Sequence, residues 1–188
     1  MIEHLTRKHQ ADLLTKLGNL MRNQVILLLV IFCLSGCAFT VESHDSFTLY
    51  LVRHAEKQSD GTRDPALTEA GIQRATQLAA WLTDKGITAI HSSDYKRTRG
   101  TAQPLATAMS VELSIYDPAD LPALATQLKS TQHNAYVVGH SNTTPGLARL
   151  LCNCEIADMD ESEYDRLIEI SIDGDTANAR ILKQGDLF

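Results

Sequence analysis

Two histidines directly follow apolar segments of the chain, and an arginine precedes one of them. The apolar segment 49–52 leads into Arg53 and His54, and the apolar segment 136–138 leads into His140. In open α/β sheets, ligands bind outside the carboxyl ends of the strands, so two such strands could deliver both histidines to one site. A guanidinium matches the geometry of phosphate and carboxylate groups, and Arg53 therefore indicates an anionic ligand.

A second arginine is expected at the same edge of the sheet. Arg97 lies in the segment 92–98, in the first turn of an expected helix that follows a strand-like segment. Free backbone N–H groups at the start of that helix would add to an anion site. Neither arginine is informative alone, because such residues are usually solvated at strand ends and on helix faces. Together with the two histidines, they predict one anion-binding site.

Strand-like and helix-like segments alternate along most of the chain. Runs of apolar, β-branched or aromatic residues predict strands at 47–52, 87–91, 111–116 and 135–138. Capping residues and apolar spacing predict helices at 68–85, 92–109, 119–129 and 144–151. Pro104 is expected to kink the second helix or displace its start. Segments 167–172 and 179–182 predict an antiparallel hairpin. The alternation favours a three-layer α/β/α sandwich with a mostly parallel sheet and this C-terminal hairpin at its edge.

Composition limits the classes of function. The 188 residues suit one domain, or one domain with a tail, and a hydrophobic fraction of 44% is ordinary for a globular fold. A net charge of −6 argues against a nucleic-acid surface, which would be basic. Affinity for an anion must therefore come from a local cluster of cations such as Arg53 and Arg97.

The first part of the chain resembles a bacterial lipoprotein signal. A basic segment precedes an apolar run of ten residues, which is too short to span a bilayer but suits a signal peptide. The run leads into Leu-Ser-Gly-Cys37, which resembles a lipobox. This resemblance implies a signal peptide over 1–36, with Met21 as an alternative start, and a lipid on Cys37. Ala38 implies sorting to the outer membrane.

Two further divisions of the chain follow from this reading. A short tether is expected over 37–46, and one domain over 47–188. Within that domain, Cys152 and Cys154 form a C-x-C pair without a second Cys/His pair at zinc-like spacing. A disulfide and two free thiols both remain open for this pair, and we assign it no function.

Several segments resemble the motifs of the histidine phosphatase (phosphoglycerate-mutase-like) superfamily. The segment 51–56, with Arg53 and His54, resembles the Arg-His-Gly/Ala signature of that family, and the segment 66–71 resembles its LTxxG helix start. The segments that resemble the family's second-arginine motif, its second-histidine motif and a strand entry common in small members are 92–102, 138–141 and 163–167. The motifs occur in the family's order from about residue 49 onward.

The resemblance implies a role for each of the four residues. It assigns His54 as the nucleophile, whereas spacing alone would not choose between His54 and His140. Arg53, Arg97 and a protonated His140 would bind a phosphate dianion and stabilise its transition state. His54 must be neutral to attack phosphorus, and nearby cations favour that form. No metal or other cofactor is implied.

The proton donor for the leaving group is open. Mutase members of the family have a glutamate shortly after the third strand, and this chain has Asp117 and Asp120 there. Asp117 is the first choice for the general acid and Asp120 the second. Glu56, close to the nucleophile, is the third candidate.

These expectations converge on a metal-independent phosphatase that acts on a phosphate monoester and is held by its lipid on the periplasmic side of a bacterial membrane. A resemblance to periplasmic members that act on phosphorylated lipopolysaccharide core sugar suggests an envelope substrate. Two alternatives stay open. One is a cytoplasmic enzyme that acts on phosphohistidine or a small metabolite, and the other is a phosphate-binding lipoprotein without catalysis.

Overall fold

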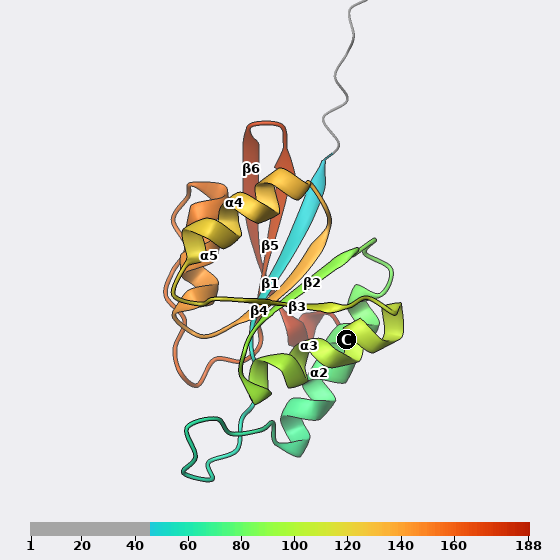
Figure 1. The fold of residues 1–188 in the computed structure, drawn as a ribbon, viewed down its shortest axis with the longest axis vertical. Coiled ribbons are helices and arrows are strands. Elements are labelled where there is room, and N and C mark those ends of the chain that lie inside the picture. The colour runs from blue at the N-terminus through green and yellow to red at the C-terminus, as the bar shows by residue number, and fades with distance from the viewer. Residues whose placement is uncertain (1–45) are drawn as a thin grey trace, which may run out of the picture. The chain divides into compact units, whose positions relative to one another are not determined.

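The computed structural model describes residues 46–188, in which strands and helices alternate along the chain (Figure 1). In chain order, the elements are β1 (Phe47–Arg53), α2 (Glu69–Leu82), β2 (Ala89–Ser93), α3 (Lys96–Met109), β3 (Leu113–Tyr116), α4 (Leu121–Thr131), β4 (Ala135–Gly139), α5 (Thr143–Cys152), β5 (Arg166–Asp173), β6 (Thr176–Lys183) and the 3-10 helix η1 (Gln184–Asp186). The predictions for the signal peptide, for Cys37 and for most of the tether lie outside the described residues.

One mixed sheet forms the middle of the domain, with strand order β3-β2-β4-β1-β5-β6. The first four strands in this order pair in parallel. Strand β5 runs antiparallel to both β1 and β6, so the predicted hairpin extends the sheet at one edge. The predicted sandwich, with its mostly parallel sheet and C-terminal hairpin, is therefore confirmed.

Alternate residues of β1 pack into two separate hydrophobic cores. Leu49 and Leu51 lie in a core shared with residues of α4 and α5, whereas Tyr50 and Val52 lie in a core shared with α2 and α3. Because successive side chains of a strand point to opposite faces, a strand covered on both faces must be apolar throughout. This explains why the first segment carries no polar alternation. Figure 1 shows α2 and α3 as one group and α4 and α5 as another.

Local signals place α2 and α3, with one error. Thr68 caps α2 as expected, because its hydroxyl accepts a hydrogen bond from the backbone N–H of Gly71. The expected start of α3 at 92–94 is wrong. Strand β2 continues through Ser93 and Tyr95 is the N-cap, so α3 begins at Lys96. Pro104 lies inside α3, which continues to Met109, and it does not displace the helix start.

The register of β1 against β4 brings the two histidines together. Arg53 is paired with Gly139 in this parallel ladder. The residues that follow are His54 and His140, and the backbone N–H of His54 donates to the Gly139 carbonyl at 2.9 Å. The carboxyl end of the sheet therefore carries both histidines, as the sequence predicts.

Two further facts concern the described residues. Cys152 and Cys154 form a disulfide, which decides the alternative that the sequence left open. No helix among residues 46–188 is long and apolar enough to cross a membrane.

Candidate active site

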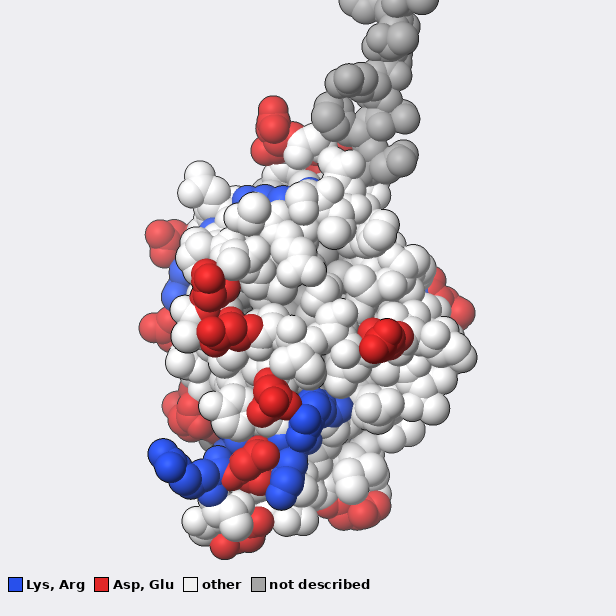
Figure 2. Space-filling model, viewed as in Figure 1, with Lys and Arg blue, Asp and Glu red and all other residues white. Residues whose placement is uncertain are grey.

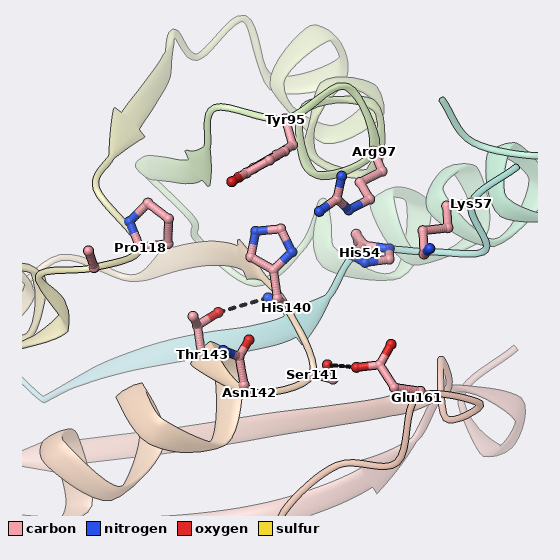
Figure 3. Close-up of a pocket in the computed structure, with 11 residues that line it drawn as sticks. His54, Lys57, Tyr95, Arg97, Pro118, His140, Ser141, Asn142, Thr143 and Glu161 are labelled. Carbon is pink, nitrogen blue, oxygen red and sulfur yellow. Dashed lines mark hydrogen bonds between the residues drawn. The ribbon is translucent and has the colours of Figure 1, made fainter. Parts of the chain in front are cut away.

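A pocket of about 460 Å³ lies at the carboxyl end of the sheet (Figure 3). Loops after β1, β2, β3 and β4 contribute to it, together with the segment between α5 and β5. The residues that line it are His54, Lys57, Tyr95, Arg97, Pro118, Ala119, His140, Ser141, Asn142, Thr143 and Glu161. Three of the four residues expected to do chemistry are in this set, and Arg53 is not.

One hydrogen bond fixes the ring of His54. Its Nδ1 lies 2.8 Å from the carbonyl oxygen of Ala55. A carbonyl can only accept, so in the neutral ring Nδ1 carries the proton and Nε2 keeps a free lone pair. His54 thus has the tautomer that a nucleophile acting through Nε2 requires.

The loop around His54 is held by both α3 and the start of α2. The backbone N–H of Ala55 donates to the hydroxyl of Thr101 in α3 at 2.9 Å. At the start of α2, Gly71 touches the backbone of Glu56 so closely that a Cβ on Gly71 would collide with the Glu56 carbonyl oxygen. The LTxxG segment therefore has a physical purpose: its glycine lets α2 pack against the loop that carries the nucleophile.

The environment of His54 keeps the ring neutral. Burial lowers the pKa of His54 to about 4, and the charges of Arg53, His140 and Arg97 act in the same direction. The hydrogen bond to Ala55 opposes them only in part. At neutral pH the lone pair on Nε2 is therefore available, as the family resemblance implies for a nucleophile.

Arg97 brings a guanidinium to the pocket whose hydrogen-bonding capacity is largely unused. Its Nε and Nη1 atoms are buried without a hydrogen-bond partner. The nearest carboxylate, that of Asp64, lies 3.6 Å from Nη1, and the guanidinium stacks on the ring of Tyr95 at 4.4 Å. Buried donors without acceptors are costly, so this guanidinium is suited to receive the oxygens of an anion.

His140 lies next to His54, and its surroundings favour the neutral ring. The two rings stand edge to face with their centres 5.6 Å apart. His140 Nε2 is 2.9 Å from the hydroxyl of Ser93, and its backbone N–H donates to Thr143 Oγ1. Burial, followed by the charges of Arg97 and Arg53, lowers the pKa of His140 to about 4. The expected protonated form is thus not the form of the free protein at neutral pH.

The expectation that Arg53 points its guanidinium at the pocket is not met. Its side chain is only 1% exposed, and it is held by the segment between α5 and β5. Nη1 donates to the carbonyls of Asp160, Glu161 and Glu163, and Nη2 donates to Glu161 Oε2 at 2.8 Å. The ring of Tyr164 packs against the guanidinium at 4.3 Å. Only Nε is buried without a partner.

Neither aspartate proposed as the acid lines the pocket. The exposed Asp117 accepts a hydrogen bond from the backbone N–H of Ala119, an arrangement that turns the chain toward α4. Asp120 is the N-cap of α4 and accepts from Ala123 N. Both carboxylates therefore serve the local backbone, which is the common use of aspartate beside a helix start.

Glu56 is engaged elsewhere, and a fourth carboxylate lies in the pocket. Both oxygens of Glu56 accept from Arg74 of α2, and although burial acts to raise its pKa, these hydrogen bonds and the charge of Arg74 lower it. Glu161 is the one carboxylate among the lining residues of the described chain. Sequence reasoning missed it, because no motif or periodicity marks the segment 155–162.

Among residues 46–188, no group of three or more His, Cys, Asp or Glu side chains is arranged to hold a metal ion. The chemistry of the donors agrees with this, since the pocket combines cations with imidazoles and a single carboxylate. Such a set suits an anion rather than a cation.

Part of the chain matches a known family in sequence. The family model described as "Histidine phosphatase superfamily (branch 1)" matches residues 49–118. This stretch contains Arg53, His54 and Arg97 and ends before His140. Two of the three pocket residues predicted to do chemistry are thus covered by the sequence match.

Curated relatives match over a similar length. A "Probable phosphoglycerate mutase GpmB" of Erwinia tasmaniensis is 41% identical over 76 residues, which are 37% of this chain and 35% of that protein. The protein of the same name from Escherichia coli K12 is 43% identical over 75 residues, or 37% of this chain and 34% of its own length. The chain therefore spans about a third of the length of the curated relatives it matches.

Solved structures extend the similarity across the fold. The protein histidine phosphatase SixA complexed with tungstate has a TM-score of 0.63 at 16% identity and covers 76% of this chain and 100% of its own. The alpha-ribazole phosphatase of Shigella flexneri has a TM-score of 0.60 at 16% identity, with 73% and 96% covered. A mycobacterial glucosyl-3-phosphoglycerate phosphatase has a TM-score of 0.57 at 15% identity, with 73% and 98% covered. Residues 49–118 thus resemble the histidine phosphatase superfamily in sequence, and the described domain has the fold of these solved phosphatases.

Proposed function

We propose that the protein is a phosphatase that hydrolyses a phosphate monoester through a phosphohistidine on His54. In the first step, Nε2 of His54 attacks phosphorus, the P–O bond to the leaving group breaks, and the alkoxide takes up a proton. In the second step, water attacks phosphorus, the P–N bond breaks, and inorganic phosphate leaves with His54 restored. Two easier steps thus replace one difficult one.

The observation that carries this proposal is the state of His54. Its Nδ1 is tied to the Ala55 carbonyl, and its pKa of about 4 leaves Nε2 unprotonated at neutral pH. The guanidinium of Arg97, whose Nε and Nη1 have no hydrogen-bond partner, lines the same pocket. A neutral imidazole nucleophile beside a cation with free donors suits phosphoryl transfer to nitrogen.

His140 supports the transferred group in this scheme. Its pKa is held down by burial and by the two arginines. A bound dianion cancels part of that positive charge and adds an acceptor, and both changes raise the pKa of His140. His140 then becomes a charged donor to the phosphoryl oxygens as the substrate binds.

The substrate we propose is a small phosphate monoester or one exposed on a larger envelope molecule. A pocket of about 460 Å³ accommodates a phosphoryl group with part of its leaving group. On the side of His140 away from His54, the pocket is lined by Tyr95, Pro118 and Asn142 (Figure 3), where we place the leaving group. These residues are uncharged, which suits a neutral leaving group such as a sugar.

The proposal includes a lipid anchor on Cys37 and a position on the periplasmic side of the membrane, in the outer membrane by the sorting rule. The lipobox-like segment supports it. The described domain begins with Phe47 at the opposite end of β1 from Arg53, about 20 Å away at the usual rise of a strand. Incorporation of labelled palmitate that is lost in Cys37→Ala tests the anchor, and equal labelling of both proteins contradicts it.

The catalytic proposal is tested with p-nitrophenyl phosphate. The detergent-solubilised protein should hydrolyse it in the presence of EDTA, and His54→Ala should abolish turnover. Tungstate is a suitable inhibitor, because a protein of the same fold has been crystallised with it. Tungstate binding without turnover between pH 4 and 9 would instead make the protein a binding lipoprotein.

A further inference from the structure

Glu161 occupies a position in the pocket that the proposed phosphatase activity does not explain. Its Oε2 accepts from Arg53 Nη2 at 2.8 Å, and its Oε1 accepts from the hydroxyl of Ser141. Both partners lie at the carboxyl end of the sheet, Arg53 as the last residue of β1 and Ser141 just after β4. The carboxylate thus joins the two loops that carry the histidines.

The two members of the Arg53–Glu161 pair differ strongly in burial. The Arg53 side chain is 1% exposed, and the Glu161 side chain is 77% exposed. Three backbone carbonyls hold Nη1 of Arg53 and do not depend on the Glu161 side chain. The carboxylate can therefore rotate into solvent while the guanidinium stays in place.

The charge of Glu161 is fixed at neutral pH. Hydrogen bonding from Ser141 lowers the pKa of Glu161, and the charges of Arg53, His54 and Lys57 add to this effect. Figure 3 shows its carboxylate beside Ser141, with Arg97 on the other side of the two imidazole rings. An ionised carboxylate in this place satisfies a cation and a hydroxyl donor, as the oxygens of a phosphate would.

From these contacts we propose that Glu161 is an internal competitor for the substrate anion, a role that rests on the proposed function of the pocket. In the structure it accepts from Nη2 of Arg53 and from the hydroxyl of Ser141. When a dianion enters, the carboxylate turns outward and leaves both donors to the ligand. Because Glu161 is largely exposed, its carboxylate regains water when it leaves the pair, and a dianion whose oxygens accept from several donors displaces it.

This competition determines specificity by charge. A ligand must interact more favourably with Arg53 and Ser141 than the Glu161 carboxylate does. It must also bind despite the negative charge of Glu161 nearby. A tetrahedral dianion meets the first condition, whereas a monoanionic phosphodiester or a carboxylate gains less. Glu161 therefore disfavours weakly charged ligands in a pocket that would otherwise bind many anions.

The test is a calorimetric titration of the full-length protein, in detergent at pH 7, with tungstate. Glu161→Gln keeps the shape and removes the charge, and it should bind tungstate about tenfold more tightly than the wild type. Glu161→Ala should gain at least as much. Asp158→Asn is the matched control, because that carboxylate lies in the same segment but faces Arg149, and its affinity should stay unchanged.

The competing outcomes are distinct from failure of the phosphatase proposal, because tungstate binding needs no turnover. Tighter binding in Glu161→Gln supports the competitor role even if no substrate is hydrolysed. Equal or weaker binding in both Glu161 variants overturns it, as does an absence of binding in all of the proteins. Slower turnover without tighter binding also overturns it, and would make Glu161 a proton carrier.

Discussion

The neutral state of the two histidines has a consequence for stability that can be measured without any substrate. The pKa of His54 and that of His140 lie at about 4 in the folded protein, against 6.5 for an ordinary histidine. The unfolded chain therefore binds protons more readily than the folded one between these values. Because each lowered pKa favours the unfolded protonated form, the free energy of unfolding falls as the pH falls from 6.5 towards 4.

The size of the effect follows from these pKa values. Between pH 7 and pH 5.5, each of the two histidines should lower the free energy of unfolding by about 1 kcal/mol, and the pair by about 2 kcal/mol. Most carboxylates remain ionised over this interval, so they contribute little. His91 also has a pKa lowered by burial and adds in the same direction.

Variants of the two histidines separate their contribution to the pH dependence of stability from the contributions of all other titratable groups. Urea unfolding of the wild type, His54→Asn and His140→Asn at pH 7 and pH 5.5 gives the pH dependence of each protein. The two histidines together cause a fall in the free energy of unfolding between pH 7 and pH 5.5, and each variant should lose about half of that fall. This holds whatever the stability of the variant at pH 7. If both variants keep the full pH dependence of the wild type, the histidines are not held neutral and the account of the nucleophile is wrong.

Three further predictions concern single residues. Gly71→Ala should lower the free energy of unfolding by about 2 kcal/mol or more, because its Cβ meets the backbone of Glu56, whereas Gly185→Ala, which has open space, should change it little in the same urea titration. Arg97→Gln should weaken tungstate binding at least about tenfold by calorimetry, since it removes a charged donor, and unchanged affinity would contradict the anion site. Asp117→Asn should leave the hydrolysis rates of good and poor leaving groups within about twofold of the wild type in steady-state assays, because its carboxylate lies outside the pocket, and selective slowing of poor leaving groups would restore it as the acid.

The surface around the pocket agrees with an anionic substrate for a protein of net negative charge. On the face shown in Figure 2, most basic side chains gather at the lower end, with acidic ones among them. Lys57 lines the pocket, and the exposed Lys96 and Arg99 belong to the first turn of α3 beside Arg97. Local cations rather than net charge thus serve the site.

Sequence reasoning located the site because its main residues depend on local signals and on parallel pairing. An apolar run that is buried on both faces predicts a central strand, and parallel strands end at the same edge of the sheet. These two facts place His54 and His140 at one edge of the sheet, whereas their adjacency also depends on the pairing of β1 with β4, which the sequence did not predict. The cap at Thr68 and the C-terminal hairpin are equally local, and the structure confirms both.

The errors have a different cause, because they depend on where side chains turn after the backbone is placed. Arg53 was expected to face the ligand, but the distant segment 160–163 supplies four acceptors for it. Asp117 was expected to face the leaving group, but a backbone N–H two residues away takes its carboxylate. Glu161 has no sequence signal, since its role arises only when its segment folds over β1.

The central claim is a covalent phosphoryl group on His54, and it can be tested directly. The protein is mixed with p-nitrophenyl phosphate, quenched in alkali to preserve phosphohistidine, and digested for mass spectrometry. The account predicts a phosphoryl adduct on the peptide that carries His54, formed within one turnover and absent from His54→Ala. Hydrolysis that proceeds at the wild-type rate in His54→Ala, or an adduct on His140 in place of His54, would contradict it.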